Sequence, residues 1–192
     1  MGVGNTEYNV SEKYKFIWLA PERTGSRKVA EILGYYGFVN KGNILFNSGK
    51  YNYSHYSPNI DGFEGYKLIC NSRNPYSRVY SLFKNFYYGS KDKSKESFKR
   101  YLTEGLPQGQ MMRMVVNPPI TVKPDYIIRL EYMTDDLLKL PFIFDVLTEK
   151  QVHLLSHHEK PIDSWEEFYD EESKTIVYDL LKYQFDMFGY EK

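Results

Sequence analysis

Residues 66–86 constrain the fold of this chain most, because they combine the sequence signals of a strand, a turn and a helix. The run 66–70 (Tyr-Lys-Leu-Ile-Cys) is short, apolar and rich in β-forming side chains, which is typical of a buried strand in a parallel sheet. Pro75 suits the first turn of a helix, where its missing N–H would have no intrahelical partner. Apolar side chains then recur at the i, i+3, i+4, i+7 spacing of a helix that faces a core: Val79, Leu82, Phe83 and Phe86.

Polar side chains gather where the predicted strand ends and the helix begins. They are Arg73, Ser77, Arg78 and Ser81. In open α/β sheets, ligands bind at the carboxyl ends of the strands, and helix N-termini offer N–H groups to anions. The stretch therefore predicts an anion-binding site.

A second strand-to-helix segment lies upstream. Residues 15–20 (Lys-Phe-Ile-Trp-Leu-Ala) predict the first strand of the sheet, followed by a helix that Ser26 caps and Gly37 ends. The connecting loop, 21–27 (Pro-Glu-Arg-Thr-Gly-Ser-Arg), contains a glycine, two hydroxyl residues and two arginines, which suits it to wrap an anion. On spacing alone a simpler interpretation stays open, in which the arginines of both segments are ordinary surface residues: Arg23, Arg27, Arg73 and Arg78.

The remaining pattern indicates a single α/β domain. Residues 125–130 predict a third strand, and three strands that alternate with helices favour a parallel sheet. The length of 192 residues fits one domain over 1–192, with 1–14 as a flexible N-terminal segment. Residues 38–65 predict a long irregular loop, and loops of that length are uncommon in compact domains unless they are functional.

Further helices are predicted in the second half of the chain. They cover 95–102, 107–116 and 171–188, and Gly189 ends the last of them. Ser164 and Glu167 have the spacing of a capping box.

Composition narrows the classes of partner. The 25 basic and 25 acidic side chains balance, so the chain has no overall field to hold a nucleic acid or an anionic membrane. The single cysteine, Cys70, cannot form an internal disulfide, and its apolar strand predicts an inert buried thiol. Residues 1–15 lack an apolar leader, and no run approaches the ~18 apolar residues that span a bilayer. A soluble, cytoplasmic protein is expected.

The two basic segments resemble the nucleotide-binding motifs of sulfotransferases. The run Arg73-Asn-Pro-Tyr-Ser-Arg-Val-Tyr-Ser81 resembles the segment in which an arginine, and a serine eight residues later, hold the 3′-phosphate of 3′-phosphoadenosine 5′-phosphosulfate (PAPS). The run Pro21-Glu-Arg-Thr-Gly-Ser26 resembles the family's 5′-phosphosulfate loop, usually Pro-Lys-x-Gly-Thr-Thr, whose lysine contacts the transferring sulfonate. Arg23 stands at the lysine position, and Arg27 replaces the second hydroxyl residue.

This resemblance carries expectations about fold and site. It implies a P-loop-like, three-layer α/β fold with a central, mostly parallel sheet flanked by helices, and PAPS as the sulfonate donor without a metal. Residues Ile128-Arg129-Leu130-Glu131 with Asp135, and the ending 185–190, resemble the carbohydrate-type branch of the family. The cofactor-binding residues that the resemblance implies are Arg23, Thr24, Gly25, Ser26, Arg27, Arg73 and Ser81.

Transfer to an acceptor hydroxyl needs a base in addition to Arg23. His55 is the predicted base, because histidine titrates near neutral pH and this residue lies between the two basic segments in sequence. Asp61 and Glu64 are the alternatives. The acceptor is expected to be a carbohydrate or another small molecule. The remaining histidines, predicted to be surface or substrate-side residues rather than zinc ligands, are His153, His157 and His158.

Two other functions stay open at this point. One is a kinase-like phosphotransferase with a degenerate phosphate loop, although the chain lacks the Gly-x-x-x-x-Gly-Lys-Ser/Thr motif. The other is a module that binds sulfated or phosphorylated ligands without catalysis.

Overall fold

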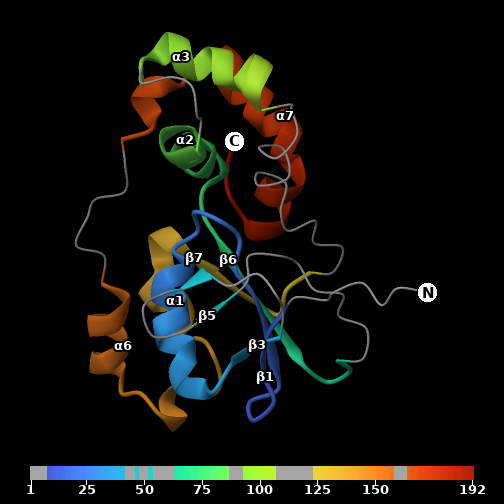
Figure 1. The fold of residues 1–192 in the computed structure, drawn as a ribbon, viewed down its shortest axis with the longest axis vertical. Helices are drawn as coiled ribbons and strands as arrows, with labels where there is room; N and C mark the ends of the chain where they lie inside the picture. The colour runs from blue at the N-terminus through green and yellow to red at the C-terminus, as the bar shows by residue number, and fades with distance from the viewer. Residues whose placement is uncertain are drawn as a thin grey trace. The chain divides into compact units, whose positions relative to one another are not determined.

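The computed structural model describes residues 8–41, 46–47, 52–53, 63–86, 93–106, 123–157 and 164–192. The chain groups into two compact units, which Figure 1 shows in ribbon form. Unit 1 comprises Met1–Ser72 and Pro118–Glu159, and unit 2 comprises Arg73–Asn117 and Lys160–Lys192. The single domain over 1–192 that the chain length predicts stays a prediction.

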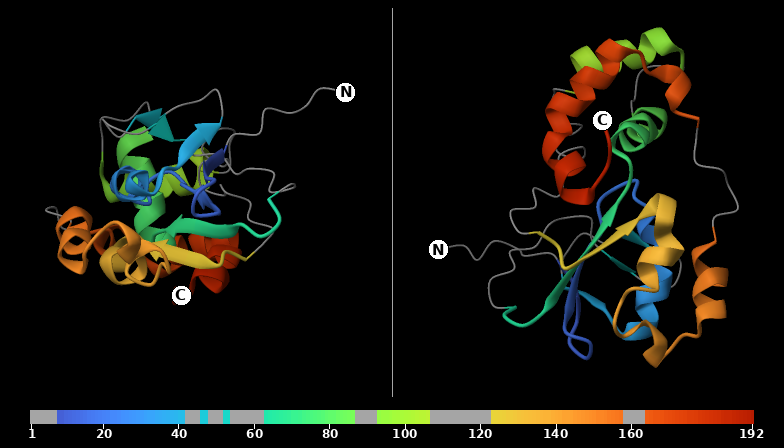
Figure 2. Two further views of the ribbon diagram at one scale, coloured as in Figure 1. Left: turned by 90° about the horizontal axis from the view of Figure 1, so that it is seen from below. Right: turned by 180° about the vertical axis from the view of Figure 1, so that it is seen from behind.

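Unit 1 is built on a mixed five-stranded sheet in the order β3-β1-β2-β6-β7. Strands β2, β6 and β7 are parallel neighbours, whereas β1 is antiparallel to both β2 and β3. Four strands therefore run in one direction, as expected for a mostly parallel α/β sheet, and Figure 2 shows them from two further sides. The bounds are β1 Tyr8–Ser11, β2 Phe16–Leu19, β3 Val39–Lys41, β6 Lys67–Ser72 and β7 Tyr126–Arg129. A separate pair consists of β4 Phe46–Asn47 and β5 Asn52–Tyr53.

Short helices complete unit 1. They are α1 Ser26–Leu33, α5 Met133–Leu137 and α6 Glu149–Ser156, with 3₁₀ turns at η1 Gly34–Tyr36, η3 Leu130–Tyr132 and η4 Ile143–Asp145. The apolar side chains of α1 and the sheet share one core, in which Trp18, Ile69 and Ile128 are fully buried. The rings of Phe16 and Phe142 stack in this core, with centroids 5.1 Å apart. This core holds the strand ends and the N-terminus of α1 in place.

Unit 2 is helical and has an aromatic core. Its elements are α2 Pro75–Phe86, α3 Lys95–Arg100, a π-helical turn η2 Tyr101–Gly105, η5 Glu166–Phe168 and α7 Glu171–Phe188. The rings of Phe83 and Phe98 lie 5.1 Å apart, and Tyr76 meets Phe185 of α7 edge to face at 5.1 Å. The core therefore fixes the buried side of α2 against α3 and α7.

The local sequence signals predicted several elements correctly. The strand expected at 66–70 is β6, the helix expected from Pro75 is α2, and the strand expected at 125–130 is β7. Gly189 ends α7 in the left-handed conformation, as predicted. The parallel pairing of the three predicted strands is confirmed.

Other predictions were wrong or incomplete. Gly25, not Ser26, is the N-cap of α1, and Ser26 is its first helical residue. The capping box expected at Ser164 and Glu167 is not formed, since η5 has no side-chain cap. Asp170 caps α7, and a capping box lies at Thr148 and Gln151 of α6 instead. Part of the N-terminal segment expected to be flexible forms the strand β1. The side chains of Asn9 and Val10 in this strand are buried. The helix predicted at 107–116 lies outside the described residues.

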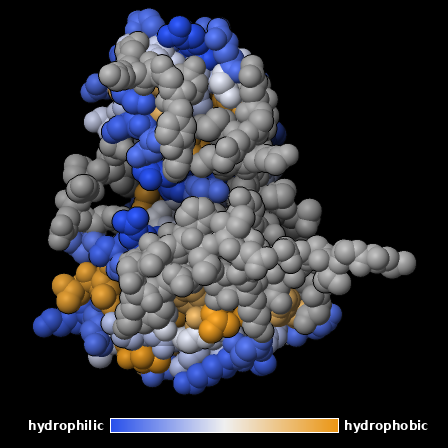
Figure 3. All heavy atoms as spheres, in the orientation of Figure 1, coloured by the Kyte–Doolittle hydropathy of each residue, from blue (hydrophilic) through white to orange (hydrophobic). Residues whose placement is uncertain are grey.

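Membrane-spanning helices are absent from the part of the chain that the structure describes. None of its helices has the length and apolar character to cross a bilayer. Large hydrophobic side chains do reach the surface of unit 1 at Phe144, Val146 and Leu154. Figure 3 shows several separate hydrophobic patches on the lower part of the face that it draws.

Candidate functional site

The loop 21–27 between β2 and α1 has an unusual backbone. Arg23 has φ 63° and Gly25 has φ 78°, so two residues in the left-handed region lie on either side of Thr24. A residue other than glycine is uncommon in that region, where it costs of order 1–2 kcal/mol and is found at turns and functional sites. The loop is therefore held in a shape that its sequence does not favour locally at Arg23.

Two buried hydroxyl groups hold that shape. Thr24 Oγ1 donates a hydrogen bond of 2.7 Å to the carbonyl oxygen of Pro21, and Ser26 Oγ donates one of 2.9 Å to the same oxygen. The two hydroxyl oxygens lie 3.2 Å apart. Each hydroxyl proton thus has a partner within the loop, either the Pro21 carbonyl oxygen or the other hydroxyl, so the hydroxyls shape the loop and cannot donate to an anion while these bonds persist.

The N-terminus of α1 offers backbone N–H groups instead. Gly25 caps the helix without a side-chain hydrogen bond, and its carbonyl accepts from the N–H groups of Lys28 and Val29 at 3.0 and 3.3 Å. The N–H groups of Ser26 and Arg27 stand earlier in the first turn, where a helix provides no partner. Together with the helix dipole, they favour a negative charge at this end.

A buried polar network lies beneath this loop. Asn71 of β6 accepts a 2.8 Å hydrogen bond from Trp18 Nε1 and donates one of 3.4 Å to the carbonyl oxygen of Thr24. Asn9 of β1 donates to the Trp18 carbonyl at 3.0 Å. The side chains of Asn9, Trp18 and Asn71 are fully buried. Sequence reasoning missed this network, although a lone asparagine at the end of an apolar strand was its visible signal.

In unit 2, the start of α2 presents side chains rather than N–H groups. Arg73 Nε donates a 2.9 Å hydrogen bond to Ser77 Oγ. Ser77 and Ser81 are four residues apart in α2, which places them on one face of the helix, and Arg73 reaches Ser77 from the residues before the helix. Arg73 is only 7% exposed, and both serines are buried. Ser77 therefore stands between Arg73 and Ser81 in sequence and adds a second hydroxyl group to the predicted pair.

Asn74 takes up N–H groups at the N-terminus of α2. Its Oδ1 accepts from the N–H groups of Tyr76 and Ser77 at 3.0 and 3.3 Å. The sequence-based expectation that this helix end offers its N–H groups to an anion is thus wrong for these two groups. The cause is a side-chain cap supplied by the residue just before Pro75.

Arg78 belongs to the interior of unit 2. It is 2% exposed, and its Nη1 donates to Gln184 Oε1 of α7 at 3.3 Å. Burial raises the pKa of the neighbouring Tyr101 hydroxyl, and the positive charge of Arg78 opposes that rise. The interpretation of all four arginines as surface residues is therefore wrong for Arg73 and Arg78. Arg27 is exposed, and Arg23 is half-buried.

Another arginine, Arg129, stands at the end of β7 and stabilises the fold. Arg129 donates from Nε and Nη2 to the Asp136 carboxylate at 2.9 and 2.8 Å, and Lys139 donates to it at 2.8 Å. Burial raises the pKa of Asp136, but these hydrogen bonds outweigh it, so the pKa lies below its ordinary value of 3.8. The family resemblance pointed to Asp135, which is exposed, whereas the buried partner is its neighbour.

The predicted bases fall in different places. His55 and Asp61 lie outside the described residues, and Glu64 is exposed in the turn before β6. His153 lies on the surface of α6, with Nε2 3.7 Å from a Glu149 carboxylate oxygen. Searching the described ranges finds no cluster of three or more residues suited to hold a metal ion.

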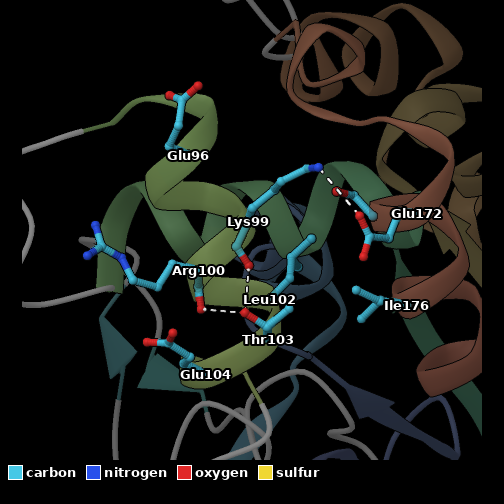
Figure 4. Close-up of a pocket in the computed structure, with 9 residues that line it drawn as sticks. Glu96, Lys99, Arg100, Leu102, Thr103, Glu104, Glu172 and Ile176 are labelled. Carbon is cyan, nitrogen blue, oxygen red and sulfur yellow. Dashed lines mark hydrogen bonds and ion pairs between the residues drawn. The ribbon is translucent and has the colours of Figure 1, made fainter.

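An open pocket lies elsewhere in unit 2, between α3 with η2 and α7, and its volume is about 450 Å³. Figure 4 shows Lys99 reaching across it toward Glu172, with Leu102 and Ile176 as apolar lining. Both acidic and basic side chains line the pocket, and none of the predicted cofactor-binding residues does. The pocket therefore does not coincide with the sequence-predicted site.

Comparisons with known proteins returned no match. The chain matches no family model, no curated protein and no solved structure.

Proposed function

We propose that this chain is a sulfotransferase that moves a sulfonate group from PAPS to an acceptor hydroxyl of a carbohydrate or another small molecule. The observation that carries the proposal is the pairing of β2 with β6. The two strands are adjacent and parallel, with Leu19 opposite Cys70, and each leads directly into one of the basic segments. Carboxyl ends of adjacent parallel strands lie at one edge of a sheet, where α/β proteins bind their ligands.

The 3′-phosphate is assigned to the start of α2. Arg73 and Ser81 hold it in this proposal, and the bond from Arg73 to Ser77 supports their role. A guanidinium already oriented by a neighbour loses less conformational entropy when it binds a phosphate. The spacing of four residues also puts Ser77 and Ser81 on the same face of α2, and Arg73 bonds to the first of them.

The 5′-phosphosulfate is assigned to the loop 21–27. Arg23 and Arg27 supply positive charge, and the N–H groups of Ser26 and Arg27 supply donors at the start of α1. Thr24 and Gly25 contribute through the loop backbone, since the Thr24 hydroxyl already donates to Pro21. The P-loop-like, three-layer form of the α/β fold belongs to the same proposal.

The reaction is an in-line displacement at sulfur. The acceptor oxygen attacks the sulfonate, the sulfur–oxygen bond to the 5′-phosphate breaks, and its electron pair leaves with 3′,5′-diphosphoadenosine. The acceptor proton passes to a base, which we assign to His55, with Asp61 and Glu64 as alternatives. Positioning and charge stabilisation supply most of the rate, as in phosphoryl transfer, so Arg23 acts on the charge that develops at the leaving oxygen.

Ligand-dependent melting tests the nucleotide assignment. PAPS and 3′,5′-diphosphoadenosine are expected to raise the melting temperature without Mg²⁺, because a ligand that binds only the folded state stabilises it. A rise with ATP and Mg²⁺ alone would support the kinase-like alternative. Binding of the nucleotide without transfer of labelled sulfonate to any acceptor in a broad library would support the non-catalytic module.

The base assignment has a separate test. His55→Ala is expected to leave nucleotide binding intact and to remove sulfonate transfer. Glu64→Gln, at an exposed turn residue, is the matched control and is expected to retain transfer. The reverse pattern would move the base role to Glu64, and loss of transfer only in Asp61→Asn would move it to that residue.

A further inference from the structure

We propose that Asn71 is a positioning residue for the anion loop 21–27, acting through its hydrogen bond to the carbonyl group of Thr24. This inference rests on the proposed function, because it assigns the loop to the phosphosulfate. Asn71 itself touches no ligand in this proposal. It fixes the backbone that presents the N–H groups and Arg23.

The contacts single out this asparagine. Its amide oxygen accepts from Trp18 Nε1 at 2.8 Å, and this bond directs its amide nitrogen to the Thr24 carbonyl oxygen at 3.4 Å. Asn71 and Trp18 are fully buried, and Thr24 is almost so. Buried polar groups in a network of this kind hold one arrangement, because a flipped amide would face the Trp18 N–H with its own NH2 group and the Thr24 carbonyl with its own oxygen.

The loop needs such an external support. The bonds from Thr24 and Ser26 to Pro21 join one part of the loop to another, and they do not fix the loop to the sheet. Asn71 provides that connection, because it lies on β6 while its bond reaches the residue between the two left-handed positions. The left-handed conformation of Arg23 persists only where surrounding contacts determine it.

The position of Asn71 also relates it to the other basic segment. It stands two residues before Arg73 along the chain, and Trp18 stands three residues before Pro21. The same strand therefore supports one anion segment through a side chain and leads into the other through its backbone. A change at Asn71 is expected to act first on the loop 21–27, since that is where its side chain bonds.

Matched substitutions separate positioning from core packing. Asn71→Leu keeps the number of side-chain heavy atoms, with a somewhat larger volume, and removes both hydrogen-bonding groups of the amide. Asn9→Leu is the control, because Asn9 is equally buried and donates to the Trp18 carbonyl oxygen, whereas Asn71 donates to the carbonyl oxygen of Thr24 in the loop. Trp18→Phe removes the donor that orients Asn71 together with part of a buried ring, and it serves as the test if Asn71→Leu fails to fold.

Two measurements on the full chain follow. Calorimetric titration with 3′,5′-diphosphoadenosine gives the Kd, and hydrogen exchange of the free protein, read by mass spectrometry, reports on the amides of 22–28. For Asn71→Leu we expect a Kd about tenfold higher, because a loop that is no longer held in one arrangement must be ordered when the nucleotide binds. Faster exchange in 22–28 should accompany it. Trp18→Phe should show a smaller change in the same direction, and Asn9→Leu should match wild type in both readouts.

The outcomes separate the two proposals. An unchanged Kd and unchanged exchange in Asn71→Leu, or equal changes in Asn9→Leu, would overturn the positioning role. If wild type does not bind the nucleotide, the proposed function fails and the binding role of Asn71 fails with it. In that case faster exchange in Asn71→Leu alone would still establish that Asn71 holds the loop, and unchanged exchange would refute it.

Discussion

The two basic segments follow neighbouring parallel strands, yet each presents its charges differently. In the loop 21–27, Arg27 is exposed, and the N-terminus of α1 has no side-chain cap. At the start of α2, Arg73 is buried and bonded to Ser77, and Asn74 caps the helix. The first segment thus offers backbone donors and accessible charge, whereas the second offers oriented side chains.

This difference matches the two tasks in the proposed reaction. A phosphate that only anchors the nucleotide is best held by groups that are fixed before binding, because they lose little entropy. A sulfonate in transit changes its charge distribution, and backbone N–H groups at a helix end stabilise the charge that develops. The following variants are designed to break or sharpen this contrast.

Arg73→Ala should have the largest effect on nucleotide binding. A charge-assisted hydrogen bond is worth about 1.5–3 kcal/mol, so the Kd for 3′,5′-diphosphoadenosine should rise by about 10- to 100-fold. Arg100→Ala, an exposed arginine of α3, is the control and should bind like wild type. Calorimetric titration gives both values, and equal affinity in the two variants would remove Arg73 from the site.

Asp136→Asn tests whether Arg129 stabilises the fold and takes no part in binding the nucleotide. Loss of the buried carboxylate beside Arg129 should lower the free energy of unfolding by about 2 kcal/mol at pH 7, below the 3–5 kcal/mol of fully buried pairs because Lys139 is exposed. Nucleotide affinity should not change. Asp135→Asn, its exposed neighbour, is the control in the same denaturant titrations.

The pH dependence of that difference has a defined sign. The pKa of Asp136 is lowered in the folded state, so its stabilisation is complete above the unfolded value of about 3.9 and is lost as the pH falls through the folded pKa. The stability gap between wild type and Asp136→Asn should therefore narrow below about pH 4. A gap that stays constant from pH 7 to pH 3 would contradict the ion-pair account.

Gly25→Ala probes the left-handed backbone of the anion loop. Alanine at φ 78° should cost about 1 kcal/mol of stability. Gly189→Ala, at φ 72° with nothing within 4 Å of the added Cβ, carries a similar backbone cost at the end of α7. Only Gly25→Ala should also weaken nucleotide binding, by a few-fold. Equal affinity in the two variants would separate the loop conformation from binding.

Arg27→Ala should have the smallest effect. Arg27 is exposed, so its contribution is screened and worth roughly 0.5 kcal/mol, about a twofold change in Kd. The difference from wild type should disappear at about 1 M salt, where the Debye length is about 3 Å. A large, salt-independent loss would show that Arg27 acts like Arg73, and the contrast between the segments would not hold.

Local signals explain how much of the fold could be predicted. Pro75 and the apolar spacing behind it determine α2 within a few residues of chain, and Gly189 determines the end of α7 through its left-handed conformation. The parallel sheet followed from the alternation of strands and helices. These features depend on neighbours in sequence, which is why sequence reasoning found them.

The missed features depend on partners far apart in the chain. β1 contains the buried polar residues Asn9 and Ser11, whose burial makes sense only through pairing with β2 and β3. The bond between Trp18 and Asn71 joins residues 53 apart. Whether Asp135 or Asp136 pairs with Arg129 depends on which of the two carboxylates faces β7. The roles of the predicted site residues, His55 included, stay predictions.

Discrimination of the 3′-phosphate tests the central claim most directly. Calorimetric titration would compare 3′,5′-diphosphoadenosine with adenosine 5′-monophosphate, both without Mg²⁺, in wild type and Arg73→Ala. We expect wild type to prefer the 3′-phosphorylated ligand by at least about tenfold and the variant to lose most of that preference, since the effects of interacting groups are not additive. Equal affinity for the two ligands in wild type, or an unchanged preference in Arg73→Ala, would contradict the assignment of this segment to the 3′-phosphate.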